Sequence, residues 1–155
     1  MTIAAAIALN AVVTIGLPWT LIRLTERYPI ARMPLGRFRW VGVLVATGGV
    51  WFYAWSLQRL LARHTSALPG QPPSVLETDG LYRRVRHPLL LGVVGILAGE
   101  AVAAQSWLVL AYAFAYWIFL DRFVAWYEEP SLHRAFGPAY ADYCRDVRRW
   151  WPRLR

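Results

Sequence analysis

The chain has 155 residues, of which 57% are hydrophobic and 17% charged, so its apolar content exceeds that of an average soluble domain. All 17 basic residues are arginine, and with 9 acidic residues they give a net charge of +8. On so hydrophobic a chain of single-domain length, this excess favours membrane lipids as partners and argues against nucleic acid.

The first half of the chain contains two segments long enough to cross a membrane. A bilayer core of about 30 Å needs roughly 20 apolar residues in a helix, and segment 3–22 meets this length with Pro18 near its end. It has no basic leader and no small-residue cleavage site, so we expect it to be retained. The second span, 38–61, carries Gly42, Ala46 and Gly49 at helical spacing, which predicts close packing against another helix.

The second half is predicted to form a loop, a helical hairpin and a polar tail. Residues 64–87 contain several prolines and glycines, which prevent a continuous helix. The apolar segments 88–104 and 107–124 are separated only by Gln105 and Ser106, so they must form a tight hairpin. In the tail, 127–155, apolar and aromatic residues recur three or four positions apart, which predicts an amphipathic helix along the membrane interface.

The predicted fold class is an all-α integral membrane protein, with one domain over 1–155, about four transmembrane helices and a C-terminal interfacial helix. Five arginines lie in the first connector, 23–39, and the other twelve come later in the chain. The hairpin brings 64–87 and 127–155 to one side, and the larger arginine count there predicts that this side is cytoplasmic. We expect an inner or plasma membrane location; the sequence does not indicate an oligomeric state.

Four polar side chains are predicted to meet at the cytoplasmic end of the hairpin. Because its two arms have comparable length, Arg86 and His87 before the first arm come close to Glu128 and Glu129 after the second. Charges at membrane ends commonly serve as anchors or solvate the start of a helix. They can equally form a ligand site, and the residues by themselves leave both interpretations open.

The motifs around this hairpin resemble those of a known family. The string Gly80-Leu81-Tyr82-Arg83-Arg84-Val85-Arg86-His87-Pro88, followed by Glu128-Glu129, Phe136-Gly137, Tyr140 and Tyr143, resembles the isoprenylcysteine carboxyl methyltransferase family. Phospholipid N-methyltransferases of the membrane type are similar. The resemblance covers residues 76–152. One departure is Leu90, which stands where the family commonly has a tyrosine, so one expected hydrogen bond to the cofactor or at the substrate entrance is missing.

The resemblance implies an S-adenosylmethionine-dependent methyltransferase whose lipophilic acceptor, a carboxylate, amine or thiol, enters from the bilayer. It also implies a cofactor pocket under the C-terminal segment. Arg86 and Glu129 are the catalytic candidates, and the implied cofactor-binding residues are Tyr82, Arg86, His87, Glu128, Glu129, Phe136, Tyr140 and Tyr143. The zwitterionic methionine end of this cofactor needs both a cationic and an anionic partner, which these residues supply.

Methyl transfer from a sulfonium requires alignment and exclusion of water, so we expect neither a metal nor a nucleophilic side chain. Cys144, His64 and His133 are interpreted as structural or interfacial. Glu100 and Asp121 lie in or beside the hairpin helices, where they could join a pocket or pair with arginine.

Two other functions remain possible at this stage. A sterol-reductase-like enzyme with a nicotinamide cofactor has a similar C-terminal signature, although about four helices are few for it. A noncatalytic membrane scaffold would have kept the fold without the chemistry, and the intact polar motif argues against it.

Overall fold

The computed structural model describes residues 8–62 and 75–152, and its regular elements are helices. The longer ones are α2 (Leu17–Arg27), α3 (Arg39–Ala62), α4 (Pro88–Ala103), α5 (Trp107–Phe123), α6 (Glu129–Phe136) and α7 (Pro138–Asp146). Three continuous helical stretches, Ala8–Arg27, Gly36–Ala62 and Trp107–Phe136, are long and apolar enough to cross a membrane, and α4 is a shorter apolar helix. The predicted all-α membrane fold is therefore confirmed.

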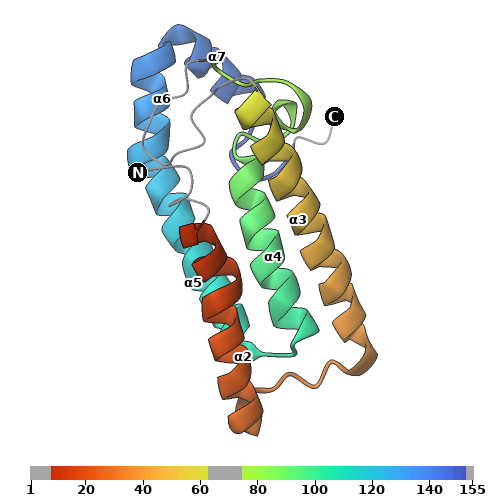
Figure 1. Cartoon of the computed structure of the whole chain (residues 1–155). Coiled ribbons are helices and arrows are strands. Elements are labelled where there is room, and N and C mark those ends of the chain that lie inside the picture. The colour runs from red at the N-terminus through yellow and green to blue at the C-terminus, as the bar shows by residue number, and fades with distance from the viewer. Residues whose placement is uncertain (1–7, 63–74, 153–155) are drawn as a thin grey trace.

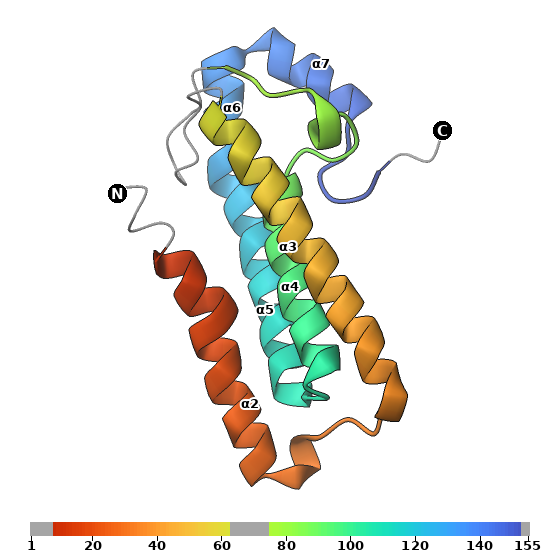
Figure 2. The ribbon, with the colours of Figure 1, turned by 45° about the vertical axis from the view of Figure 1, so that its right-hand side comes forward.

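Helix α4 lies at the centre of the bundle (Figures 1 and 2). It packs against α3 on one side and α5 on the other, and α2 lies against α5. Large apolar side chains on the outside remain exposed, including Leu44 at 73% and Phe114 at 60% of their full accessibility. In water such a surface would favour aggregation, but against lipid acyl chains it is the expected one.

Glycines bring the backbones of α3 and α4 into direct contact. A Cβ atom at Gly42 would lie 2.3 Å from the backbone nitrogen of Ala103, and one at Gly49 would lie 2.5 Å from that of Ile96. On the α4 side, a Cβ at Gly99 would lie 2.3 Å from the nitrogen of Ala46. The predicted packing of the Gly42, Ala46 and Gly49 face is thus confirmed, and the partner is the first arm of the hairpin.

The hairpin reverses over Ala104, Gln105 and Ser106, as its two-residue polar linker predicts. Gln105 adopts a positive φ of 53°, which turns the chain, and Ser106 caps α5 by accepting a hydrogen bond from Val109 N at 3.1 Å. The Ser106 hydroxyl also lies 2.6 Å from that of Thr25, so the cap ties α2 to the turn. This end of the bundle is consequently fixed by buried polar contacts.

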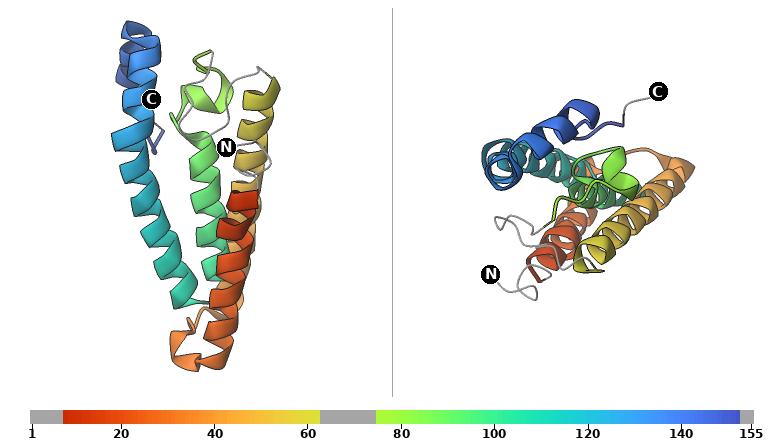
Figure 3. Two further views of the ribbon diagram at one scale, coloured as in Figure 1. Left: turned by 60° about the vertical axis from the view of Figure 1, so that its left-hand side comes forward. Right: turned by 90° about the horizontal axis from the view of Figure 1, so that it is seen from above.

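The chain continues past α5 in the same direction instead of bending immediately into the interface. A π-helical segment, η5 (Val124–Glu128), joins α5 to α6, so the helix runs unbroken for 30 residues from Trp107 to Phe136. At 1.5 Å per residue this is about 45 Å, longer than a bilayer core, so α6 projects beyond the hydrocarbon. The chain then turns at Gly137, whose φ is 53°, and α7 folds back over the bundle end (Figure 3).

Several predicted boundaries shift. The first span runs to Arg27, five residues past the predicted end at 22, while residues 3–7 of that prediction lie outside the described part of the chain. Spans 38–61 and 88–104 agree with the helices to within two residues. The amphipathic tail is divided between α6 and α7 because Gly137 interrupts it. Residues 64–74 of the predicted loop 64–87, including His64, also lie outside the described residues.

Candidate functional site

The polar motifs of the second half meet at the end of the bundle where α4 begins. Short helix η4 (Gly80–Arg83) leads to Pro88, whose ring suits the first turn of a helix because that turn needs no N–H partner. The segment after α7 returns alongside it: Val85 pairs with Arg148 in a parallel bridge, and Arg86 N donates to Arg148 O at 3.0 Å. Backbone contacts therefore hold the start of α4 and the C-terminal segment together.

Glu129 is the centre of an ion-pair network. Its Oε1 lies 3.0 Å from Arg86 Nη1 and accepts a 3.0 Å hydrogen bond from Arg149 Nε, while its Oε2 accepts from Arg149 Nη2 at 2.6 Å. The Glu129 and Arg86 side chains are only 12% and 14% exposed, so water screens these charges weakly. One carboxylate thus joins two guanidinium groups from distant parts of the chain.

His87 is buried beside both glutamates. Its Nδ1 lies 3.2 Å from Glu128 Oε1, and its Nε2 lies 3.6 Å from Glu129 Oε1. Burial alone would lower the pKa of His87, but the facing carboxylates of Glu128 and Glu129 outweigh it and raise this pKa above the usual 6.5. These distances show that Arg86 and His87 lie next to Glu128 and Glu129, as the hairpin predicts.

Asp121 and Arg149 extend the network, together with Trp150. Arg149 Nη1 donates to Asp121 Oδ1 at 3.0 Å, and the Trp150 indole N–H donates to the same oxygen at 2.8 Å. The sequence left Asp121 open between pocket and arginine pair, and the structure pairs it with arginine. Arg149 and Trp150 lie in the tail that the sequence predicts as an amphipathic helix, but the structure places them after the end of α7, in a non-helical segment.

The tyrosines form a second layer around the network. Tyr82 and Tyr140 are buried, and the Tyr143 hydroxyl donates to Tyr82 O at 2.7 Å, which ties α7 to η4. Burial raises the pKa of Tyr143 well above its usual value, so its hydroxyl stays a neutral donor. Arg86 Nη1 also contacts Cys144 Sγ at 2.7 Å, which gives that cysteine a structural contact. Phe136, at the end of α6, is half-buried but is not brought to the network by any polar or ring contact in the described structure.

The side chains present suit the methionine end of S-adenosylmethionine. Cationic groups (Arg86, His87) and anionic ones (Glu128, Glu129) lie within hydrogen-bonding reach of one another, as a ligand with both an ammonium and a carboxylate requires. Arg86 Nε and the Tyr140 hydroxyl are buried without a hydrogen-bond partner among the described residues. Buried donors of this kind are costly unless a ligand or water satisfies them.

Comparison with known proteins identifies the family. Residues 38–139 match the phospholipid methyltransferase family, a stretch that contains α3, the hairpin and most of the polar network. The chain belongs to the phospholipid methyltransferase family. The resemblance to membrane methyltransferases in the second half is therefore confirmed, and the family extends back over α3. A search of curated proteins finds no match.

A solved structure shares the fold of this family member. It is the eukaryotic intramembrane Ras methyltransferase, isoprenylcysteine carboxyl methyltransferase, with a TM-score of 0.66 and 23% sequence identity over 95% of this chain. The match covers 52% of that protein, so the chain spans about half its length. The likeness establishes that the helices are arranged in the same way.

Leu90 has an apolar environment in this family member. It packs with Val94 and Tyr116 against the buried cluster of Leu120, Val124 and Trp150. At the position where a tyrosine hydroxyl was expected from the resemblance, the structure therefore has an apolar contact with a cluster that includes Trp150, whose indole N–H donates to Asp121. This packing gives Leu90 a role in holding the C-terminal segment in place.

Proposed function

We propose that the protein transfers a methyl group from S-adenosylmethionine to a lipophilic acceptor held in the membrane. The observation that carries this proposal is the network of Arg86, His87, Glu128, Glu129 and Arg149, which lies at one end of a membrane-spanning hairpin in a member of the phospholipid methyltransferase family. Its groups match the charges of the cofactor, and its place at the membrane end gives access to both water and lipid.

Arg86 and His87 would hold the carboxylate of the cofactor's methionine end, and Glu128 its ammonium. Arg86 keeps one buried N–H unused, and Glu128, with a side chain 33% exposed, is the more accessible of the two glutamates. Glu129 is already satisfied by Arg86 and Arg149, so it would fix the direction of Arg86. We propose that methyl transfer depends most on Arg86 and Glu129.

When bound, S-adenosylmethionine supplies an electrophilic methyl group on a positively charged sulfur that leaves as a neutral thioether. The protein then has to orient the acceptor and keep water away, and no acid or base is needed for the leaving group. Tyr82 and Tyr140, buried next to the network, would form the wall on the adenosine side, with Tyr143 positioned by its bond to Tyr82 O. Phe136 is proposed as the outer edge of that wall.

The acceptor would come from the bilayer, and the cofactor from the cytoplasm. The exposed apolar faces of α3 and α5 are open to lipid, so a lipophilic molecule can approach the bundle sideways. The arginines of the C-terminal half support a cytoplasmic position for the network in an inner or plasma membrane. A carboxylate, an amine or a thiol attached to an apolar group would each fit this description.

The proposal is tested by methyl transfer in vesicles. Purified full-length protein is reconstituted with a membrane lipid extract and S-adenosylmethionine labelled in the methyl group, with His87→Ala as the site variant and Arg145→Gln, at an exposed position of α7, as the control. Label in the lipid fraction that depends on His87 supports the proposal, and release of volatile label by alkali marks a carboxyl ester, since methylated amines and thiols are stable. Folded protein that transfers no label to any fraction, and binds a nicotinamide dinucleotide instead, would favour the reductase alternative.

A further inference from the structure

The end of the bundle opposite the network carries a strong positive charge. The end of α2, the connector and the start of α3 contain one acidic residue, Glu26, and five arginines, Arg23, Arg27, Arg32, Arg37 and Arg39. Glu26 pairs with Arg23 at 3.4 Å, and both side chains are more than half exposed. Among the described residues the other four arginines have no acidic partner, so this end of the bundle carries an excess of positive charge that would attract an anion.

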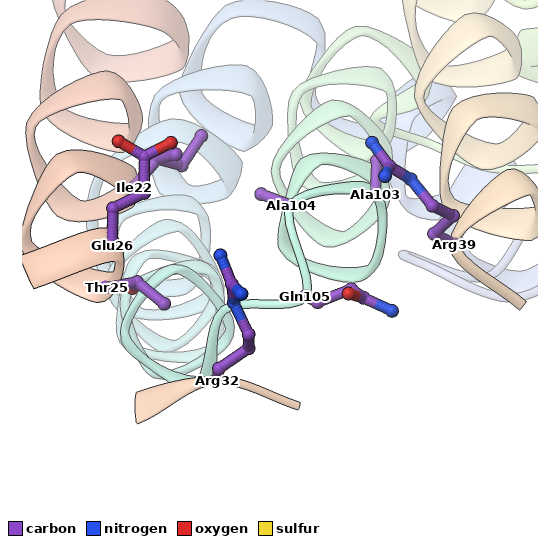
Figure 4. Close-up of a pocket in the computed structure, with 8 residues that line it drawn as sticks. All are labelled: Ile22, Thr25, Glu26, Arg32, Arg39, Ala103, Ala104 and Gln105. Atoms are coloured by element: carbon purple, nitrogen blue, oxygen red, sulfur yellow. The ribbon is translucent and has the colours of Figure 1, made fainter. Parts of the chain in front are cut away.

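A polar pocket of about 290 Å³ opens at this end (Figure 4). It lies between α2, the connector and the end of α4, and its lining is Ile22, Thr25, Glu26, Arg32, Arg39, Ala103, Ala104 and Gln105. Arg32 and Arg39 flank the Ala103–Gln105 turn in the figure. The Gln105 side-chain amide donates one N–H to Gly36 O at 3.2 Å, which leaves its second N–H available. At this volume the pocket suits a small charged group better than a drug-sized ligand.

The backbone also favours an anion here. Arg39 is the first residue of α3, and η3 (Gly36–Phe38) with Arg37 immediately precedes it. The amino-terminal end of a helix carries a partial positive charge, so arginines at this position repel it unless a negative group lies between them. A phosphate next to Arg32 and Arg39 would remove this repulsion.

We infer that this pocket binds a phosphate group, supplied by an anionic phospholipid of the leaflet on this side of the membrane. Exposed apolar side chains surround the same end, among them Tyr28, Phe38 and Trp40 at 55%, 72% and 65% exposure, and they would contact the acyl chains of such a lipid. A free phosphate ion would offer the same chemistry but would gain nothing from these apolar contacts. The inference is independent of the proposed methyl transfer, because about 24 Å of α4 separates this pocket from His87.

The test compares lipids and variants on the purified full-length protein. Thermal unfolding in neutral detergent is followed while short-chain phosphatidylglycerol, short-chain phosphatidylcholine or inorganic phosphate is added. The double variant Arg32→Gln, Arg39→Gln removes the two pocket charges, and Arg37→Gln is the matched control, because Arg37 lies in the same connector but does not line the pocket.

We expect saturable stabilisation by phosphatidylglycerol, with affinity lowered about a hundredfold in the double variant and unchanged in Arg37→Gln. Equal saturation by inorganic phosphate would keep the phosphate site and assign its ligand to the free ion. The inference is overturned if phosphatidylcholine stabilises as well as phosphatidylglycerol, if Arg37→Gln weakens binding as much as the double variant, or if no ligand stabilises the folded protein.

Discussion

Arg149 should stabilise the fold far more than its place near the end of the chain suggests. It makes three hydrogen bonds to two carboxylates, at 3.0 and 2.6 Å to Glu129 and at 3.0 Å to Asp121. The Glu129 side chain is 12% exposed and that of Arg149 26%, so the pair lies between a surface pair, worth at most about 1 kcal/mol, and a buried one, whose loss costs about 3–5 kcal/mol. We therefore expect Arg149→Gln to destabilise the protein by about 2–3 kcal/mol.

The control for this prediction is Arg145→Gln. Arg145 also pairs with an aspartate, Asp142, but both side chains are more than 60% exposed, so its removal should leave stability unchanged. Reversible unfolding in mixed micelles measures both variants, and Arg149→Lys should fall between them because it keeps the charge without the planar fork. Equal stability of Arg149→Gln and Arg145→Gln would refute the view that this network holds the C-terminal segment.

Two further predictions concern pH and helix packing. Glu128 and Glu129 raise the pKa of His87 above about 6.5 in the folded protein. The contribution of the charged His87 to stability should therefore be complete below pH 6.5 and be lost as the pH rises through the folded pKa. Unfolding measurements from pH 5 to 9 test this, and His87→Asn should abolish the dependence. Gly49→Ala should destabilise the bundle by about 1–3 kcal/mol or more, because a Cβ there would lie 2.5 Å from an α4 backbone nitrogen. Gly48→Ala is the control and should have no destabilising effect, because a Cβ at Gly48 meets nothing within 4 Å. Comparable decreases in the unfolding midpoints of both variants would contradict this explanation of the α3–α4 packing.

The sequence predicts the membrane fold well because hydrophobic length and small-residue spacing are local signals. The same reasoning brings Arg86 and His87 to Glu128 and Glu129, since a hairpin with equal arms must place its two ends together. Their distances of 3.0–3.6 Å agree with that prediction.

Arg149 could not be found in the same way. It lies 20 residues after Glu129, beyond a turn at Gly137 and a second helix, and its place is set by a backbone bond between Arg86 and Arg148. Such long-range contacts leave no periodic trace in the sequence. Gly137 itself did carry a signal, because a glycine followed by proline commonly ends one helix and starts another. This glycine–proline signal predicts two helices, one ending before Gly137 and one starting after it, as the structure shows.

The central claim is that the polar network binds S-adenosylmethionine, and calorimetric titration of this cofactor into detergent-purified protein tests it most directly. The informative variant is Glu129→Gln, and Glu26→Gln is the control, because Glu26 lies at the opposite end of the bundle. The account predicts saturable binding to the unaltered protein and to Glu26→Gln, with Kd raised about tenfold to a hundredfold in Glu129→Gln. Folded protein that binds no S-adenosylmethionine, or binds it with the same Kd in all three forms, would contradict it.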